Sequence, residues 1–268
     1  MAVISLTTDF GTRDTYVAEM KAAILSITRD VHVVDVTHEI PPQDVLAGAL
    51  ALEAAARWFP PGTIHVAVVD PGVGTARRGL AVTAGGRTFV GPDNGLFTPF
   101  LADAGWRAFE LTAAEFRGAR VSRTFHGRDV FAPAAAHLAR GLEPHRLGPA
   151  VTDPVRLTWP EARIAGGKIG GAVLHIDRFG NLVTSIPGEA LTSLGPEITV
   201  RVAGKTLPLV RTYGELKRGN PGALVGSGNR LEIAVNAGSA AKTLRAGRGT
   251  PVVVSRTSPV GRRERRRS

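Results

Sequence analysis

The pattern of apolar segments changes at Pro160, and this change constrains the fold more than any other feature of the sequence. Before Pro160, short runs rich in β-branched residues alternate with segments whose apolar residues recur at helical spacing. The predicted strands are residues 3–7, 31–36, 63–69, 80–83 and 88–90, and the predicted helices are residues 15–27, 44–58 and 130–140. Asp14 is the expected N-cap of the first helix, and the Gly85-Gly86 pair between the last two strands predicts a hairpin. This alternation predicts a parallel or mixed sheet with helices on both faces, in which the 31–36 strand is buried.

After Pro160, short strand-like runs follow one another between Gly and Pro turns. They are residues 168–176, 182–186, 198–202, 207–210, 231–235 and 251–254, and one helix is expected at 239–244. This pattern is typical of a small β-barrel or sandwich. We therefore predict an α/β fold: an N-terminal Rossmann-like α/β/α domain at residues 1–160 and a smaller C-terminal all-β barrel domain at residues 167–254. The stretch from Trp159 to Gly167 is the expected linker.

The composition excludes several classes of site. The chain has no cysteine, which removes disulfide scaffolds, thiolate nucleophiles and Cys-ligated metals. Its 7 histidines show no paired metal-ligand spacing, so we expect neither a metal nor another cofactor. No apolar run approaches the roughly 20 residues that span a bilayer, and the N-terminus lacks the pattern of a signal peptide. We therefore expect a cytoplasmic protein with no membrane partner.

The formal net charge of +10 raises the question of a nucleic-acid partner. Residues 255–268 alone carry six arginines and one glutamate, and this segment has no apolar periodicity. We predict that it is a disordered basic tail. A tail of this charge also suits non-specific contact with phosphate backbones, but the rest of the chain lacks interleaved basic and aromatic residues. Nucleic acid is therefore not the expected partner.

Polar, Gly-rich clusters follow the predicted strands of the first domain. They are residues 8–14, 37–42, 69–78, 91–95 and 125–129. Ligands of open α/β sheets bind beyond the carboxyl ends of the strands, so the five clusters predict a polar pocket at one rim. Each cluster also has a structural interpretation: Asp9 and Asp14 as helix caps, Asp70 in an ordinary turn, and His126 as a surface residue before a helix. The Gly72-x-Gly74 pair lacks the third glycine of a dinucleotide fingerprint.

The second domain contains one comparable cluster. The string DRFGN (177–181) brings a carboxylate, an aromatic ring and an amide together within five residues, which suits a cation next to a purine. The alternative is a β-turn built on Gly180 and Asn181. Residues 227–230 are likewise a hairpin turn or a ligand-facing loop.

Taken together, the motifs resemble one family. They are TTDFGTRDTYVAEMK (7–21), DVTHEIPP (35–42), VDPGVGTAR (69–77), GPDNG (91–95), TFHGRDVFAP (124–133), DRFGN (177–181) and LEIAVNAGSAA (231–241). The chain is similar over residues 3–254 to the S-adenosyl-L-methionine (SAM) hydroxide adenosyltransferases, which are adenosine-forming SAM hydrolases related to fluorinases and chlorinases. The resemblance implies an α/β domain, a β-barrel domain and a homotrimer, with ligand bound between the first domain of one subunit and the second domain of its neighbour.

The resemblance also implies roles for individual residues. Asp70, Arg77 and His126 match the set that marks the hydrolases and that the halogenases lack. The substrate-binding residues it implies are Asp9 for the ribose hydroxyls, Asp14 and Asp177 for the methionine ammonium, Asn181 and the Ala237 backbone for adenine, and Ser227 near the carboxylate. The Phe179 ring of the DRFGN string is the surface on which we expect the purine to stack. Gln43 and Gly228 depart from the family pattern.

The activity implied is the hydrolysis of SAM to adenosine and methionine by attack of water at the ribose C5′. The alternatives are a halogenase of the same fold and a non-catalytic protein that binds SAM or adenosine.

Overall fold

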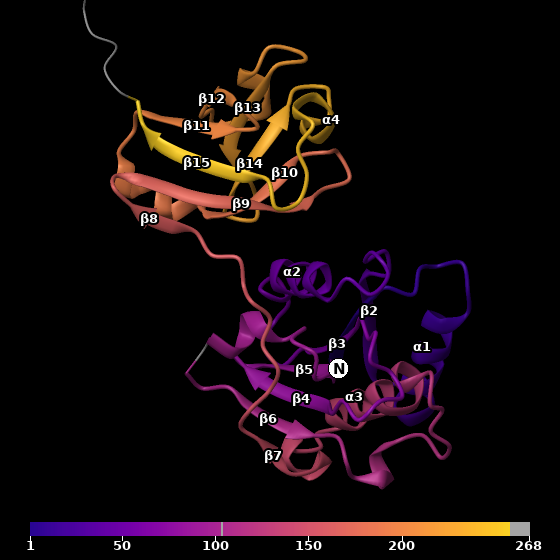
Figure 1. Ribbon diagram of the computed structural model, residues 1–268. Helices are drawn as coiled ribbons and strands as arrows, with labels where there is room; N and C mark the ends of the chain where they lie inside the picture. Colours follow the sequence, from indigo (N-terminus) through magenta and orange to yellow (C-terminus); the bar gives the residue numbers. More distant parts are fainter. Residues whose placement is uncertain (103, 258–268) are drawn as a thin grey trace, which may run out of the picture. The chain divides into compact units, whose positions relative to one another are not determined.

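The computed structural model describes residues 1–102 and 104–257 (Figure 1). The chain divides into two compact units, the first ending at Thr158 and the second beginning at Trp159. Each unit is described by itself. Within the described part of the chain, no helix is long and apolar enough to cross a membrane.

The first unit is built on a seven-stranded mixed sheet of order β2-β1-β3-β5-β4-β6-β7. Its strands are β1 (Ala2–Thr8), β2 (Val31–Thr37), β3 (Ile64–Val68), β4 (Gly79–Ala84), β5 (Arg87–Pro92), β6 (Arg107–Glu110) and β7 (Ala150–Val151). The pairs β2–β1, β1–β3 and β3–β5 are parallel, and the remaining pairs are antiparallel. The carboxyl ends of β1, β2, β3 and β5 therefore lie at one edge of the sheet.

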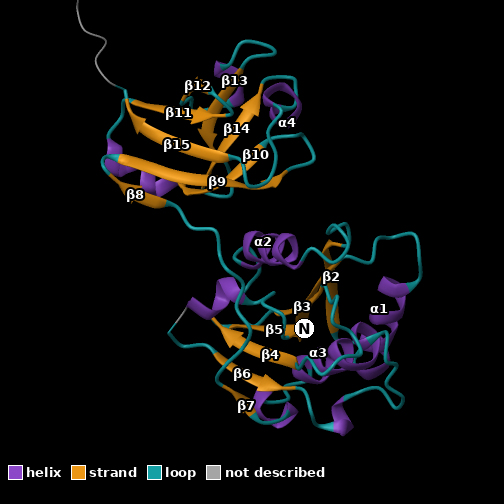
Figure 2. Cartoon of the chain, in the orientation of Figure 1, coloured by secondary structure: helices purple, strands orange, loops and turns teal. Residues whose placement is uncertain are grey.

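Helices cover both faces of this sheet, as predicted (Figure 2). The α-helices are α1 (Tyr16–Ile27), α2 (Val45–Ala56) and α3 (Ala132–Ala139), and a π-helical turn, η3 (Gly127–Phe131), leads into α3. On one face, α1 and α3 pack together and share a core with Ile4 and Leu6 of β1. Alternate strand residues such as Ser5 and His65 point to the other face, which α2 covers.

Three local expectations for this unit have clear outcomes. The β4–β5 hairpin is confirmed, with Gly85 (φ 54°) and Gly86 (φ 72°) both in the left-handed region that a two-residue turn requires. Asp14 is not the N-cap of α1: the helix begins at Tyr16 and Thr15 occupies the cap position, where its hydroxyl donates to Glu19 Oε1 (2.6 Å) and does not accept from a backbone N–H. The strand at 31–36 is not buried, because β2 lies at the edge of the sheet and exposes His32, Val34 and Asp35.

The second unit is an eight-stranded antiparallel sheet that is nearly closed into a barrel. Its elements are β8 (Arg163–Ala165), β9 (Lys168–Ile176), β10 (Leu182–Pro187), β11 (Ile198–Val202), β12 (Lys205–Pro208), β13 (Pro221–Val225), β14 (Arg230–Val235), β15 (Pro251–Arg256) and one short helix, α4 (Ala240–Leu244). The order is β12-β11-β15-β9-β10-β14-β13, with β8 paired to β9. A bridge between Leu209 and Ala223 joins the segment after β12 to β13, at the two ends of this order.

Two strands of this unit differ from the expectation. The segment from Trp159 to Gly167 was expected to be a linker, but within it β8 forms a hairpin with β9 through Gly166 (φ 55°) and Gly167 (φ 68°). The strand β13 was missed, because Pro221 and Gly222 at its start are typical of a turn. In addition, Ser255 and Arg256 belong to β15 and not to a tail. The predicted disordered tail otherwise lies outside the described residues from 258 onward.

Candidate active site

The five polar clusters of the first unit are joined to one another by direct contacts at the carboxyl edge of its sheet. The 8–14 and 37–42 clusters are connected by hydrogen bonds from Gly11 N to His38 O (2.7 Å) and between Thr8 Oγ1 and His38 Nδ1 (2.8 Å). The 8–14 and 125–129 clusters meet where the Phe10 and Phe125 rings pack edge to face, 5.7 Å between centroids. The convergence predicted from strand ends is therefore present.

The 69–78 cluster connects the 125–129 cluster to the 91–95 cluster. Arg77 reaches His126 of the 125–129 cluster, and Asn94 of the 91–95 cluster donates its side-chain amide to Val69 O (2.8 Å). Gly74 (φ 79°) lies so close to Arg123 that an added Cβ would be 2.5 Å from the Arg123 carbonyl oxygen. A glycine at this position lets the two loops approach at backbone level.

Asp70, Arg77 and His126 form a connected, partly buried group. Arg77 Nε donates to Asp70 Oδ1 (2.9 Å) and Oδ2 (3.1 Å), and Arg77 Nη2 donates to Asp70 Oδ2. The same Nη2 donates to His126 Nδ1 (2.7 Å), and the guanidinium lies 5.2 Å from the centroid of the Phe131 ring. The side chains of Asp70 and Arg77 are 5% and 11% exposed. Arg77 thus orients an acid and an imidazole from loops that lie 49 residues apart in the sequence.

The contact with Arg77 determines the protonation state of His126. A guanidinium only donates hydrogen bonds, so Nδ1 must accept and the ring proton of neutral His126 resides on Nε2. Burial, followed by the positive charge of Arg77, holds the pKa of His126 below its usual value of 6.5. His126 is therefore a neutral imidazole near neutral pH, with its N–H at Nε2.

Asp9 is held by an unusual backbone conformation. Gln43 has φ 66°, in the left-handed region, and its N–H donates to Asp9 Oδ2 (2.8 Å). Strained backbone of this kind is frequent at binding sites. Asp14, the other predicted substrate carboxylate of this unit, is exposed in the loop before α1.

The 91–95 cluster has a structural role. Asp93 accepts from Arg78 Nε (2.8 Å) and from Val155 N (2.7 Å), and Arg78 also donates to Asp153 Oδ1 (2.8 Å). These bonds attach the segment that follows β7 to the edge of the sheet.

In the second unit, Asp177 organises the DRFGN loop. Its Oδ1 accepts from Phe179 N (2.9 Å) and Asn181 N (2.8 Å), and its Oδ2 accepts from the Asn181 side-chain amide (2.9 Å). The β-turn alternative is thus correct in its geometry, but it does not explain the ring of Phe179, which is 77% exposed. An exposed aromatic ring next to a carboxylate is available to a ligand.

The two strings that the resemblance links to adenine are adjacent. Ala241 N donates to Gly180 O (3.0 Å), and an added Cβ at Gly180 (φ 84°) would be 2.1 Å from Ser239 Oγ. This contact places Asn181 next to the loop that carries Ala237, which has φ 56°. Ser227 lies in the turn between β13 and β14.

Sequence reasoning missed two residues of this region, Tyr213 and Glu232. Tyr213 Oη donates to Glu232 Oε2 (3.0 Å), and Glu232 is only 9% exposed. Burial and the nearby Asp177 raise the pKa of Glu232 above its usual value, and burial and Glu232 raise the pKa of Tyr213 to about 12. The signal in the sequence was a single glutamate within the apolar run of β14.

Among the described residues, no group of His, Asp and Glu side chains is arranged to hold a metal ion.

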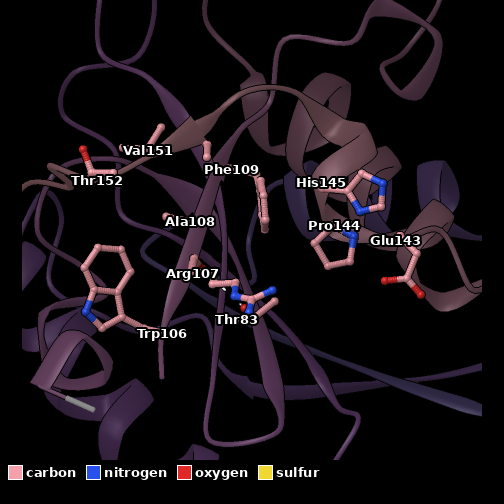
Figure 3. A pocket seen from close by; sticks show the side chains of 11 residues that line it. Thr83, Trp106, Arg107, Ala108, Phe109, Glu143, Pro144, His145, Val151 and Thr152 are labelled. Atoms are coloured by element: carbon pink, nitrogen blue, oxygen red, sulfur yellow. Dashed lines mark hydrogen bonds between the residues drawn. The ribbon is translucent and has the colours of Figure 1, made fainter. Parts of the chain in front are cut away.

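One pocket lies apart from the predicted site residues. A pocket of about 760 Å³ lies over β6 and β7, where Figure 3 shows Trp106, Phe109 and His145 around it. None of the predicted site residues lines this pocket.

Comparison with known proteins matches both units to one family. Residues 4–148 match the SAM hydroxide adenosyltransferase N-terminal domain, and residues 171–253 match the C-terminal domain of the same family. The (R)-S-adenosyl-L-methionine hydrolase of Thermus thermophilus is 46% identical over 94% of this chain and 99% of its own length. A fluorinase of Actinopolyspora mzabensis is 32% identical over 95% of this chain and 97% of its own length.

A solved structure shows the same fold. The crystal structure of an uncharacterized conserved protein from Thermotoga maritima superposes with a TM-score of 0.89 at 34% identity, covering 94% of this chain and 100% of that chain. With both domain families matched in order along most of its length, the chain belongs to the SAM hydroxide adenosyltransferase family.

Proposed function

We propose that this protein hydrolyses SAM to adenosine and L-methionine by attack of water on the ribose C5′. The observation that carries the proposal is the connected, partly buried Asp70–Arg77–His126 group, which suits the orientation and deprotonation of a water molecule. The hydrolase relative from Thermus thermophilus, at 46% identity, supports the same activity. SAM and adenosine are then the small-molecule ligands.

The chemistry requires little more than a positioned water and a route for its proton. The water oxygen forms a bond to C5′ while the C5′–sulfur bond breaks. The electron pair of the broken bond stays on sulfur, so the sulfonium leaves as the neutral thioether of methionine. No acid is needed for the leaving group. Positioning supplies several kcal/mol of the barrier, and proton acceptance contributes about 10²–10⁴ in rate.

The hydrogen bonds of Arg77 assign different tasks to the other two residues. His126 Nδ1 already accepts from Arg77 and Nε2 carries the ring proton, so His126 donates to the water oxygen and fixes its position. Asp70 also accepts from Arg77, twice at Oδ2 but only once at Oδ1, which keeps a second lone pair. Asp70 therefore accepts the proton of the attacking water.

The remaining predicted residues bind the substrate. Asp9 binds the ribose hydroxyls, Asp14 and Asp177 bind the ammonium, and Phe179, Asn181, Ser227 and Ala237 bind the adenine and the methionine carboxylate. We further propose that the first unit is Rossmann-like and that the protein is a homotrimer with composite sites. Mixing Asp9→Ala and Asn181→Ala subunits then restores part of the activity, and a monomer by light scattering would contradict this arrangement.

Product analysis tests the activity directly. Purified protein incubated with SAM and chelator is expected to form adenosine and methionine, whereas a binding protein returns SAM intact. Adding fluoride or chloride tests the halogenase alternative, because a halogenated adenosine would then appear. Activity that vanishes in chelator and returns with a divalent ion would refute the mechanism.

Two variants test the water-binding residues. Asp70→Asn and His126→Ala are expected to lower kcat by about 10²–10⁴ with little change in substrate affinity. His32→Ala, on an exposed edge position of β2, is the matched control and should retain full turnover. Near-normal turnover with lost binding in the first two variants would move both residues to the substrate pocket.

A further inference from the structure

Glu232 occupies a position in β14 that the fold alone does not explain. Its neighbours Leu231 and Ile233 point into the barrel core, so the Glu232 side chain lies on the opposite face of the strand. That face is covered, and Glu232 is only 9% exposed. Taking a carboxylate out of water costs free energy that its hydrogen bonds must offset, so stability alone gives little reason for a buried glutamate here.

The segment of residues 209–220 covers this face of β14. Val210 N donates to Ala223 O (2.8 Å) near its start, and Asn236 Nδ2 donates to Leu216 O (2.6 Å) near its end. Leu216 packs against Gly222, where an added Cβ would be 2.4 Å from Leu216 Cδ2. Between these attachments, Tyr213 donates its hydroxyl to Glu232 (3.0 Å) and keeps its ring 44% exposed.

The other carboxylate oxygen of Glu232 lies against the turn between β13 and β14. An added Cβ at Gly226 would be 1.9 Å from Glu232 Oε1, so the backbone of this turn rests directly on the carboxylate. Gly226 N donates to Arg230 O and Asn229 N donates to Gly226 O, both at 2.9 Å, which closes the turn that carries Ser227. Glu232 thus contacts both the 209–220 segment and the Ser227 turn.

Glu232 is also electrostatically close to the DRFGN loop. It pairs in register with Val183, two residues after Asn181. The negative charge of Asp177 contributes to the raised pKa of both Glu232 and Tyr213. The 209–220 segment therefore meets two segments that carry predicted substrate residues, the Ser227 turn and the DRFGN loop, around one buried carboxylate.

We propose that Glu232 is a positioning residue for SAM binding: through Tyr213 and the Gly226 backbone, it holds the 209–220 segment and the Ser227 turn in place beside the Asp177 loop. This inference rests on the proposed hydrolysis of SAM. Loss of a merely structural residue would lower both the stability of the fold and the affinity for substrate. Loss of Glu232 is expected to weaken substrate binding without weakening the fold.

The test compares Glu232→Leu, Glu232→Gln and Tyr213→Phe. Glu232→Leu is expected to raise KM for SAM about tenfold or more, as befits loss of a hydrogen bond to a charged group. Its kcat and its unfolding midpoint in urea should stay near those of the wild type. Glu232→Gln keeps an acceptor for Tyr213 and should restore KM to within about threefold. Tyr213→Phe should raise KM, and combining it with Glu232→Leu should add less than the sum of the two effects.

A spectroscopic measurement is independent of turnover. The chain has only two tyrosines, Tyr16 and Tyr213, so the ultraviolet titration of Tyr213 is identified by its loss in Tyr213→Phe. Its pKa of about 12 should fall in Glu232→Leu, since burial and Glu232 are what raise it. If the wild type does not hydrolyse SAM, the proposed function fails while this titration still tests the Tyr213–Glu232 contact.

The results that would overturn the inference are equally specific. They are an unchanged KM in Glu232→Leu, a fall in kcat at constant KM, or full additivity with Tyr213→Phe. If Glu232→Leu does not fold, Glu232→Gln and Tyr213→Phe decide: an unchanged KM in Tyr213→Phe overturns the proposal.

Discussion

Replacing Arg77 by methionine tests whether the Asp70–Arg77 pair is a buried ion pair. The side chains of Asp70 and Arg77 are 5% and 11% exposed, so water replaces the lost partner poorly. Removing one member of a buried pair costs about 3–5 kcal/mol, because the other charge stays buried without compensation. We therefore expect Arg77→Met to reduce the free energy of unfolding by about 3–5 kcal/mol and to abolish hydrolysis.

The double variant separates pairing from mere loss of contacts. In Asp70→Asn, the amide oxygen still accepts from Arg77, and the guanidinium keeps the Phe131 ring, so the expected loss is smaller, about 1–3 kcal/mol. Asp70→Asn/Arg77→Met leaves no buried charge, and it should lose less stability than the sum of the two single variants.

Urea unfolding followed by circular dichroism measures these differences in the free energy of unfolding. Because the chain has two compact units, each unit is fitted with its own unfolding transition. Arg211→Met is the matched control, since Arg211 pairs with Glu215 but is 92% exposed, and its loss should cost less than about 1 kcal/mol. A loss below about 1 kcal/mol in Arg77→Met, or strict additivity in the double variant, would refute the reasoning.

Three further predictions follow from single residues. Because the pKa of His126 in the folded protein is below 6.5, kcat should stay constant as the pH falls to 6.5 and decline at lower pH, where Nδ1 becomes protonated. The free energy of unfolding should fall over the same range, since the unfolded chain binds this proton more readily than the folded protein. A pH–kcat profile that rises on acidification would contradict this. Gly91→Ala should cost about 3 kcal/mol or more by thermal unfolding, because its Cβ would be 2.2 Å from Ala67 O, whereas Gly105→Ala, with no neighbour within 4 Å, should be nearly neutral. Gln43→Gly retains the N–H that Asp9 accepts and suits φ 66°, so KM should be unchanged, while Gln43→Pro removes this donor and should raise KM in steady-state assays.

The sequence predicted the elements well where local chemistry marks their ends. The Gly85-Gly86 pair indicated the β4–β5 hairpin, and Asp44 at the start of α2 is the N-cap, accepting from Ala47 N (3.0 Å). The same local reasoning was wrong for Gly166-Gly167, because a pair of glycines serves a flexible spacer and a tight hairpin equally well. It was also wrong about the burial of β2, since β-branched residues indicate a strand but do not indicate its place in the sheet.

The candidate site could be predicted only in part, because its contacts are long-range. Asp70 and Arg77 lie in one loop, whereas His126 joins them from 49 residues away, and only the family resemblance grouped the three. Asp93 was part of a predicted pocket cluster, but its partners Arg78 and Val155 make it structural. Glu232 was not identified, because the hydrogen bond to its carboxylate comes from Tyr213. Tyr213 lies in a segment to which the strand pattern assigned no element.

The position of Arg77 explains why an acid and an imidazole in one site need not be interchangeable. Asp70 and His126 both accept a hydrogen bond from the same guanidinium, but the consequences differ. A carboxylate with two oxygens keeps lone pairs for a further proton, whereas an imidazole that accepts at Nδ1 has only a donor left at Nε2. The positive charge that lowers the pKa of His126 also favours hydroxide-like character in a nearby water. In the proposed mechanism, one arginine that lies seven residues after Asp70 therefore sets the direction of proton transfer before any substrate is bound.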